Sequence, residues 1–171
     1  MLGGFLAEGL AEAGAKVAVL GRNAERGQRR VKSIEDKGGV AAFFQADAVQ
    51  KASLQSADDA LEKHFGPATI LVNAAGGNDP KVTVTADRSF EQIALGDWQT
   101  LFDLNLVGGV LLPCQQFGPG MVARGKGSVI NIASVAAHLP LSRVVTYLRR
   151  TSRGSRRTTS VNPGRVPGSR G

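Results

Sequence analysis

Several features that define other classes of protein are missing from this chain. It has a single cysteine, Cys114, in 171 residues, which excludes an internal disulfide framework and is typical of a reducing compartment. No apolar run reaches the roughly 20 residues that a membrane-spanning helix requires. The first residues lack a basic segment and include Glu8 and Glu12, so they do not resemble a signal peptide. These absences predict a soluble, cytoplasmic protein that does not associate with membranes.

Acidic residues are missing from the end of the chain. Residues 148–171 contain seven arginines and no Asp or Glu, whereas residues 1–147 contain 14 basic and 14 acidic residues. The formal net charge of +7 therefore belongs to the C-terminal segment and not to a domain surface. A neutral domain with a basic extension does not predict specific nucleic-acid binding, which needs a basic patch on the fold itself.

The C-terminal segment is also poor in apolar residues. Beyond residue 150 only Val161 and Val166 are apolar, among residues that are mostly Arg, Ser, Gly, Pro and Thr. Such a segment cannot bury enough apolar surface to offset the entropy lost on ordering. We therefore predict one folded domain over residues 1–147 and a disordered tail over residues 148–171.

The first 135 residues alternate between helical and strand patterns. This alternation predicts an α/β fold with a parallel sheet. The strand pattern at 68–72 is a continuous apolar run, so we expect this strand to be buried on both faces. We expect another such buried strand at 128–132. Helices are predicted at residues 2–13, from the end of the turn at 21–23 to about residue 37, at 51–65 and at 97–124, and strands at 16–20, 40–45, 68–72 and 128–132.

Small residues follow the strand predicted at 68–72, in the order Asn73-Ala74-Ala75-Gly76. Such residues let the backbone approach a bound dinucleotide at the carboxyl edge of a parallel sheet. A tight strand-to-loop turn would have the same pattern, so the motif alone does not decide between the two interpretations.

Three further polar residues stand out in an otherwise apolar context. Asn105 lies in the apolar helix at 97–124, where both ends of its amide need partners, and we expect backbone groups and an ordered water. Ser134 follows the strand at 128–132, and Tyr147 comes thirteen residues later. A tyrosine acts as general acid or base only when its pKa, ordinarily about 10, is lowered, and a nearby serine hydroxyl can hold the substrate oxygen.

Together these residues resemble the classical type of the short-chain dehydrogenase/reductase family. The family's Asn-Asn-Ala-Gly motif falls on residues 73–76, its helix asparagine on Asn105, its catalytic serine on Ser134 and its tyrosine on Tyr147. Asp47 matches the family aspartate that contacts the adenine ring. The resemblance covers residues 1–147.

The resemblance implies a Rossmann-type, doubly wound parallel sheet and hydride transfer between NAD(P) and an alcohol or carbonyl. It assigns catalysis to Ser134, Tyr147 and Asn105, and it implies a homo-oligomer with a small-molecule substrate and no metal site. The assigned cofactor contacts are Gly3, Arg22, Asp47, Asn73, Ala74, Ala75 and Gly76.

Two positions refine the expected ligands. An NAD-preferring site carries an acid at the end of its second strand, whereas this chain has Gly21 followed by Arg22, which could pair with a 2′-phosphate. This favours NADP(H) over NAD(H), although an arginine at that turn can also be simply solvated. The extended loop at residues 76–80 resembles sugar-acid oxidoreductases of the D-mannonate/fructuronate type, or is a variable surface loop.

The chain departs from the family pattern at two places. It begins inside the glycine-rich turn that follows the family's first strand, and only Gly3 of that turn remains. That strand is central in the family sheet, so its absence predicts a gap between the strands at 16–20 and 68–72, with each orphan backbone group costing about 1–3 kcal/mol. Thr151 stands where the family has the lysine that lowers the tyrosine's pKa, and the family's C-terminal strands are missing too.

Three hypotheses follow. The first is an NADP-dependent oxidoreductase of this family, and the second is an inactive remnant that binds a nucleotide weakly or not at all. The third is non-specific, salt-dependent nucleic-acid binding through the arginine-rich tail. We rank it last, because the tail has no motif and no aromatic residue.

Overall fold

A computed structural model of the chain describes residues 2–134 and the backbone of Thr159–Ser160. Helices and strands alternate, as predicted for a parallel α/β sheet. In chain order the elements are α1 (Leu2–Glu12), β1 (Lys16–Gly21), α2 (Ala24–Glu35), β2 (Val40–Gln45), α3 (Lys51–Phe65), β3 (Ile70–Asn73), the 3₁₀ turns η1 (Pro80–Val82) and η2 (Phe90–Gln92), α4 (Leu95–Phe102), the π-helical η3 (Asp103–Leu111), α5 (Leu112–Ala123), β4 (Ser128–Asn131) and β5 (Thr159–Ser160).

Glycines and a polar cap set the bounds of the first elements. The chain leaves α1 through Gly14, whose φ of 88° lies in the left-handed region that favours glycine after a helix. Asn23 caps α2, because its side-chain oxygen accepts a hydrogen bond from the backbone N–H of Arg26 at 2.8 Å. Gly38, with a φ of 82°, leads from α2 into β2. The sequence therefore places these turns through ordinary turn chemistry.

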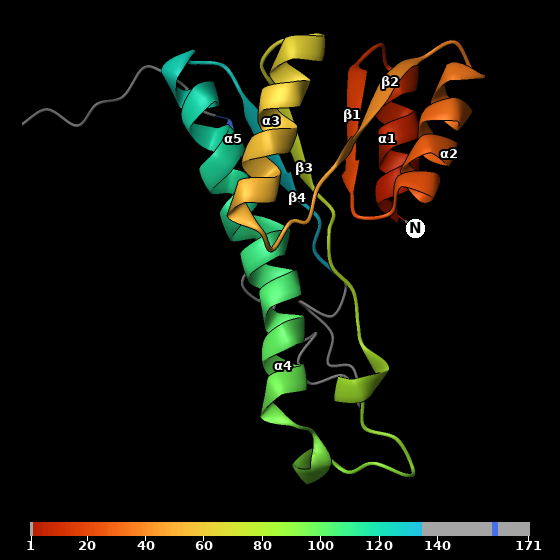
Figure 1. The fold of residues 1–171 in the computed structure, drawn as a ribbon, viewed down its shortest axis with the longest axis vertical. Helices are drawn as coiled ribbons and strands as arrows, with labels where there is room; N and C mark the ends of the chain where they lie inside the picture. Colours follow the sequence, from red (N-terminus) through yellow and green to blue (C-terminus); the bar gives the residue numbers. More distant parts are fainter. Residues whose placement is uncertain (1, 135–158, 161–171) are drawn as a thin grey trace, which may run out of the picture.

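The strands form two separate parallel pairs. β1 pairs with β2, and β3 pairs with β4. Among the described residues no strand bonds β1 to β3, so the predicted gap in the sheet is present. In Figure 1 the four strands run in the same direction and end on the side where α1 begins. The carboxyl edges of both pairs therefore face the same region.

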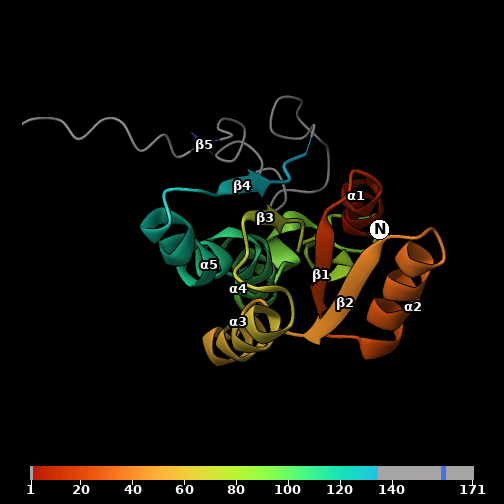
Figure 2. The same cartoon turned by 90° about the horizontal axis from the view of Figure 1, so that it is seen from above.

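Helices cover both faces of the first strand pair, which gives the doubly wound arrangement that was predicted. On one face, α1 and α2 pack against β1 and β2, with Val17, Val31 and Ile34 in the shared core. On the other face, α3 and α5 form a second core that contacts residues of β1, β2, β3 and β4. Figure 2 shows α3 and α5 on one side of the strands and α1 and α2 on the other.

The prediction that the strands at 68–72 and 128–132 are buried on both faces is wrong. Ile70 of β3 is 47% exposed, and Ser128 to Ile130 of β4 are only half-buried. The reason is the incomplete sheet: among the described residues, helices cover β3 and β4 on the α3–α5 face, and β3 lacks a neighbour on its β1 side. The apolar residues of these strands are typical of a more complete sheet than the described residues form.

The long helical region predicted at 97–124 is present but not uniform. It consists of α4, the nine-residue π-helical η3 and α5. A π-helix is rare and is often found at functional sites, and residue periodicity did not predict it. None of the described helices is both long enough and apolar enough to cross a membrane.

The tail predicted to be disordered, residues 148–171, lies outside the described residues apart from Thr159–Ser160. These two residues form β5, which pairs antiparallel with β4.

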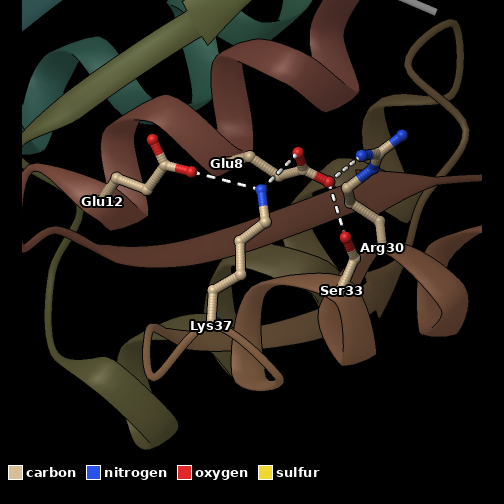
Figure 3. A network of polar contacts seen from close by, with 5 residues as sticks. All are labelled: Glu8, Glu12, Arg30, Ser33 and Lys37. Atoms are coloured by element: carbon tan, nitrogen blue, oxygen red, sulfur yellow. Dashed lines mark hydrogen bonds and ion pairs between the residues drawn. The ribbon is translucent and has the colours of Figure 1, made fainter.

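A cluster of polar side chains, the Glu8 cluster, joins α1 to α2 (Figure 3). The Glu8 carboxylate accepts hydrogen bonds from Ser33 Oγ at 2.7 Å, from Lys37 Nζ at 3.3 Å and from the Arg30 guanidinium. Lys37 also pairs with Glu12 at 3.2 Å. The hydrogen bond from Ser33, aided by Lys37 and Arg30 and opposed by desolvation, lowers the pKa of Glu8 from 4.5 to about 2. The ionised carboxylate therefore stabilises the contact between the two helices.

The Glu8 cluster predicts a pH-dependent part of the stability. Since the pKa of Glu8 is lower in the folded state, its contribution is complete above pH 4.5 and is lost as the pH falls towards 2. Urea unfolding of wild type and Glu8→Gln between pH 7 and pH 2.5 should show the variant less stable at pH 7 and the difference shrinking in acid. Glu62→Gln, at an exposed position of α3, should leave the wild-type dependence unchanged. A constant difference across this range would contradict the role given to Glu8.

Candidate functional site at the carboxyl edge

The carboxyl ends of the four parallel strands bring most of the predicted site residues to one edge of the fold. β1 leads into Arg22, β2 into Asp47, β3 into Ala74 and β4 towards Ser134. The first turn of α1 lies at the same edge (Figure 1). In an open parallel α/β sheet, ligands bind outside the carboxyl ends of the strands. This edge is therefore the candidate site.

Gly3 and Ala74 meet at this edge, although they are far apart in the sequence. A Cβ atom added to Gly3 would lie 3.2 Å from the Cβ of Ala74, so the first turn of α1 lies directly against the loop after β3. Gly76 follows with a φ of 142°, a backbone conformation that side-chain-bearing residues rarely adopt. Gly3 and Ala74 are thus in contact. Both are predicted to contact the cofactor, and they come from either side of the gap in the sheet.

Arg22 and Asp47 lie after the ends of β1 and β2. The Arg22 side chain is exposed, and no hydrogen bond or ion pair of its guanidinium group occurs within residues 2–134. Gln45 Nε2 donates to the backbone oxygen of Arg22 at 3.3 Å, which ties the two strand ends together. Asp47 is half-buried, and its Oδ1 accepts a hydrogen bond from the backbone N–H of Val49 at 3.2 Å.

The side chain of Asn73 is turned into the protein and not towards the edge. It is 4% exposed, and its Nδ2 donates to Asn131 Oδ1 at 2.8 Å and to Cys114 Sγ at 3.4 Å. These bonds join β3 to β4 and to α5. Asn73 thus fixes the end of β3, which Ala74 and Ala75 follow. Its amide supports the site by these bonds and does not face the edge.

Asn105, in η3, holds the loop after β3 by a reciprocal pair of hydrogen bonds. Its Nδ2 donates to the backbone oxygen of Gly77 at 2.9 Å, and its Oδ1 accepts from the backbone N–H of Gly77 at 2.9 Å. The side chain is 2% exposed. The backbone partners predicted for this amide therefore both belong to one residue, Gly77, which the sequence analysis did not single out.

Gly108 is a second residue that the sequence analysis missed. It is buried in η3 and lies against Ala48 and Val49, in the turn after β2. The only sign of it in the sequence is a glycine within an apolar helical run, three residues after Asn105. A glycine at such a position often marks a close approach of two backbones.

Of the other two predicted catalytic residues, Ser134 lies within the described part of the chain and Tyr147 does not. Ser134 is half-buried and comes three residues after β4, whose end is joined to β3 by a bond from the backbone N–H of Ile132 to the oxygen of Asn73 at 3.0 Å. Tyr147 and Thr151 lie outside the described residues. The structure therefore places Ser134 at the carboxyl edge.

Replacement of Asn105 should loosen this edge. In Asn105→Leu the N–H and C=O of Gly77 lose both hydrogen bonds, which should lower the free energy of unfolding by about 1–3 kcal/mol. It should also speed amide exchange in residues 75–78. Asn78→Ala removes an exposed bond to Thr83 in the same loop and should cost much less. Equal stability of the two variants, measured by urea unfolding, would show that Asn105 does not hold the loop.

Comparison with known proteins gives the evolutionary context of this edge. The sequence model of the short chain dehydrogenase family matches residues 2–148. The chain is 34% identical over 152 residues to the uncharacterized oxidoreductase UxuB of Bacillus subtilis strain 168, a match that covers 83% of this chain and 54% of the relative.

Two crystal structures have the same fold. One is a protein provisionally assigned as a D-mannonate oxidoreductase from Haemophilus influenza, with bound NAD: the TM-score is 0.82 at 30% identity, over 90% of this chain and 58% of the other. The second is a gluconate 5-dehydrogenase from Burkholderia cenocepacia in complex with NADP and tartrate: the TM-score is 0.73 at 33% identity, over 86% and 55% of the two chains. The chain spans a little over half the length of each of these proteins. Because the family model matches most of its residues, the chain belongs to the short-chain dehydrogenase family.

Proposed function

We propose that this chain forms the dinucleotide-binding part of an NADP-dependent oxidoreductase that interconverts an alcohol and a carbonyl. The observation that carries the proposal is the meeting of Gly3 with Ala74 across the gap in the sheet. It brings the first turn of α1, whose N–H groups have no partner within the helix, to the loop after β3. That arrangement suits a phosphate-bearing ligand at the carboxyl edge.

The residues at this edge fit a dinucleotide. Small residues allow close approach of the backbone at Gly3, Ala74, Ala75 and Gly76. Asp47 would contact the adenine ring. Asn73 would act by holding the strand end, since its amide is bonded to Asn131 and Cys114.

Arg22 supports NADP(H) over NAD(H). It follows β1 as an exposed cation, its guanidinium has no bonded partner in residues 2–134, and an acid that would repel a 2′-phosphate is not present at Gly21. Guanidinium groups bind phosphate with charge-assisted hydrogen bonds. Relatives with bound NAD and with bound NADP both occur, so the preference rests on Arg22 alone.

The proposed chemistry uses three residues of this chain. A bound nicotinamide supplies or accepts the hydride. Tyr147 would exchange the proton with the substrate oxygen, and the Ser134 hydroxyl would hold that oxygen. Asn105 would keep the loop after β3 in place through Gly77; we also propose that it positions a water for proton transfer.

For the substrate we propose a sugar acid or a related polyol. The support is the extended loop at residues 76–80 together with similarity to proteins described as a D-mannonate oxidoreductase and a gluconate 5-dehydrogenase. In the structure this loop is fixed by Asn105 at Gly77 and by Asp79, whose Oδ1 accepts from the backbone N–H of Lys81 at 2.8 Å. A fixed loop at the carboxyl edge can select a substrate by shape.

A second candidate function is an inactive member of the family. Thr151 cannot supply the positive charge that the family's lysine gives to the tyrosine, and β1 and β3 share no hydrogen bonds. NADPH oxidation with fructuronate or a keto-gluconate distinguishes the two candidates. Turnover that is lost in Tyr147→Phe supports the oxidoreductase, whereas NADPH binding without turnover supports the inactive member.

We also propose that the protein is a cytoplasmic homo-oligomer. Along the helical region, Leu95, Leu111 and Val122 are 70%, 48% and 64% exposed, which supplies apolar surface for a second copy. The free thiol of Cys114 fits a reducing compartment. For the arginine-rich tail we propose no specific nucleic-acid partner and no membrane contact.

Fluorescence titration with NADPH and NADH tests the cofactor assignment. Arg22→Gln should weaken NADPH binding by about 10- to 100-fold, because hydrogen bonds to a charged group contribute about 1.5–3 kcal/mol, and should change NADH binding little. Arg26→Gln, an exposed arginine in the first turn of α2, is the matched control and should bind both nucleotides as wild type does. An equal loss of both nucleotides, or no loss, would remove the basis for the NADP(H) preference.

A further inference from the structure

Gly108 is the point at which the π-helical segment η3 touches the turn after β2. A Cβ atom placed on Gly108 would lie 2.6 Å from Val49 Cγ1, 3.0 Å from the backbone carbon of Ala48 and 3.0 Å from the backbone nitrogen of Val49. The helix and the turn are therefore in backbone contact, and only glycine permits this separation without displacement of the turn. Gly118, in α5, has no atom within 4 Å of the same position, so close contact is not a general property of the glycines in this helical region.

The turn in contact with Gly108 orients Asp47. The backbone N–H of Val49 donates to Asp47 Oδ1 at 3.2 Å, and the backbone N–H of Asp47 donates to Ser53 Oγ at 2.9 Å. Since the nitrogen of Val49 both bonds the carboxylate and borders Gly108, a shift of this nitrogen would turn the Asp47 carboxylate. The direction of Asp47 therefore depends on the space left by the missing side chain at position 108.

The same π-helical segment also holds the loop after β3. Asn105 bonds both backbone groups of Gly77 at 2.9 Å, and Gly108 lies against Val49 three residues further along. The two loops follow strands of different pairs, β2 and β3, and these pairs share no backbone hydrogen bond within the described part of the chain. η3 is thus a single element in contact with both loops at the carboxyl edge.

We propose that Gly108 is a positioning residue for the adenosine half of the dinucleotide. Through the Ala48–Val49 turn it sets the direction of the Asp47 carboxylate, which faces the adenosine in the proposed function, and this inference rests on that function. It acts separately from Asn105, which positions the loop after β3. A side chain at position 108 weakens binding of the adenosine moiety and leaves the nicotinamide side unaffected.

The test compares two fragments of the cofactor on Gly108→Ala, with Gly118→Ala as the matched helical control. NMR titration with 5′-ADP should show about ten-fold weaker binding to Gly108→Ala than to wild type. Titration with reduced nicotinamide mononucleotide should give the same affinity in both proteins, and Gly118→Ala should match wild type with both probes. Because Val49 Cγ1 is the nearest atom to the added methyl group, Val49→Ala in the Gly108→Ala background should restore part of the 5′-ADP affinity.

Two results would overturn the inference. One is equal weakening of both probes with a lowered Tm, which would indicate general destabilisation. The other is unchanged 5′-ADP binding in Gly108→Ala. If wild type binds neither probe, the proposed function fails, and amide exchange then decides the inference alone. Faster exchange of the Val49 amide in Gly108→Ala than in Gly118→Ala supports the positioning role, and equal exchange contradicts it.

Discussion

The packing of α3 and α5 against both strand pairs is the interaction on which the rest of the structure depends. Leu54 and Leu61 of α3 and Phe117 of α5 form one buried core, with Leu20 of β1 and Leu71 of β3 packed against it. Since β1 and β3 have no hydrogen bonds to one another, this apolar contact aligns the two pairs. Hydrophobic packing is not directional, so other contacts must fix the positions of the strand ends and loops at the carboxyl edge.

Polar and close-packed contacts fix these positions. The Asn105 amide fixes Gly77 through two bonds, Asn73 joins β3 to β4, and Gly3 lies against Ala74. The contacts of Asn105 and Gly3 place the loop after β3, whereas the bond from Asn73 holds the ends of β3 and β4 themselves. The candidate site is thus assembled by helices and loops that reach over the strand ends, across a sheet that is interrupted at its centre.

The sequence predicts the order and type of the elements well, because period-2 and period-3.6 patterns and glycine turns act locally. It also predicts the gap beside β1, since the family pattern places a further strand between β1 and β3. The sequence does not predict the exposure of Ile70. A continuous apolar run indicates that a strand belongs inside a sheet, but it does not show which neighbouring strands are present. The π-helical turn, the choice of Gly77 as the partner of Asn105 and the contact of Gly108 with Val49 all depend on three-dimensional packing, which local patterns do not encode.

We propose that residues from both strand pairs form one nucleotide site. Backbone NMR of the whole chain during titration with NADPH tests this most directly. We expect shift changes at Arg22 and Asp47, after the first pair, and at Ala74 to Gly76, after the second, with one shared Kd. Changes confined to one pair, two different Kd values, or no change at all would show that the two pairs do not form one nucleotide site.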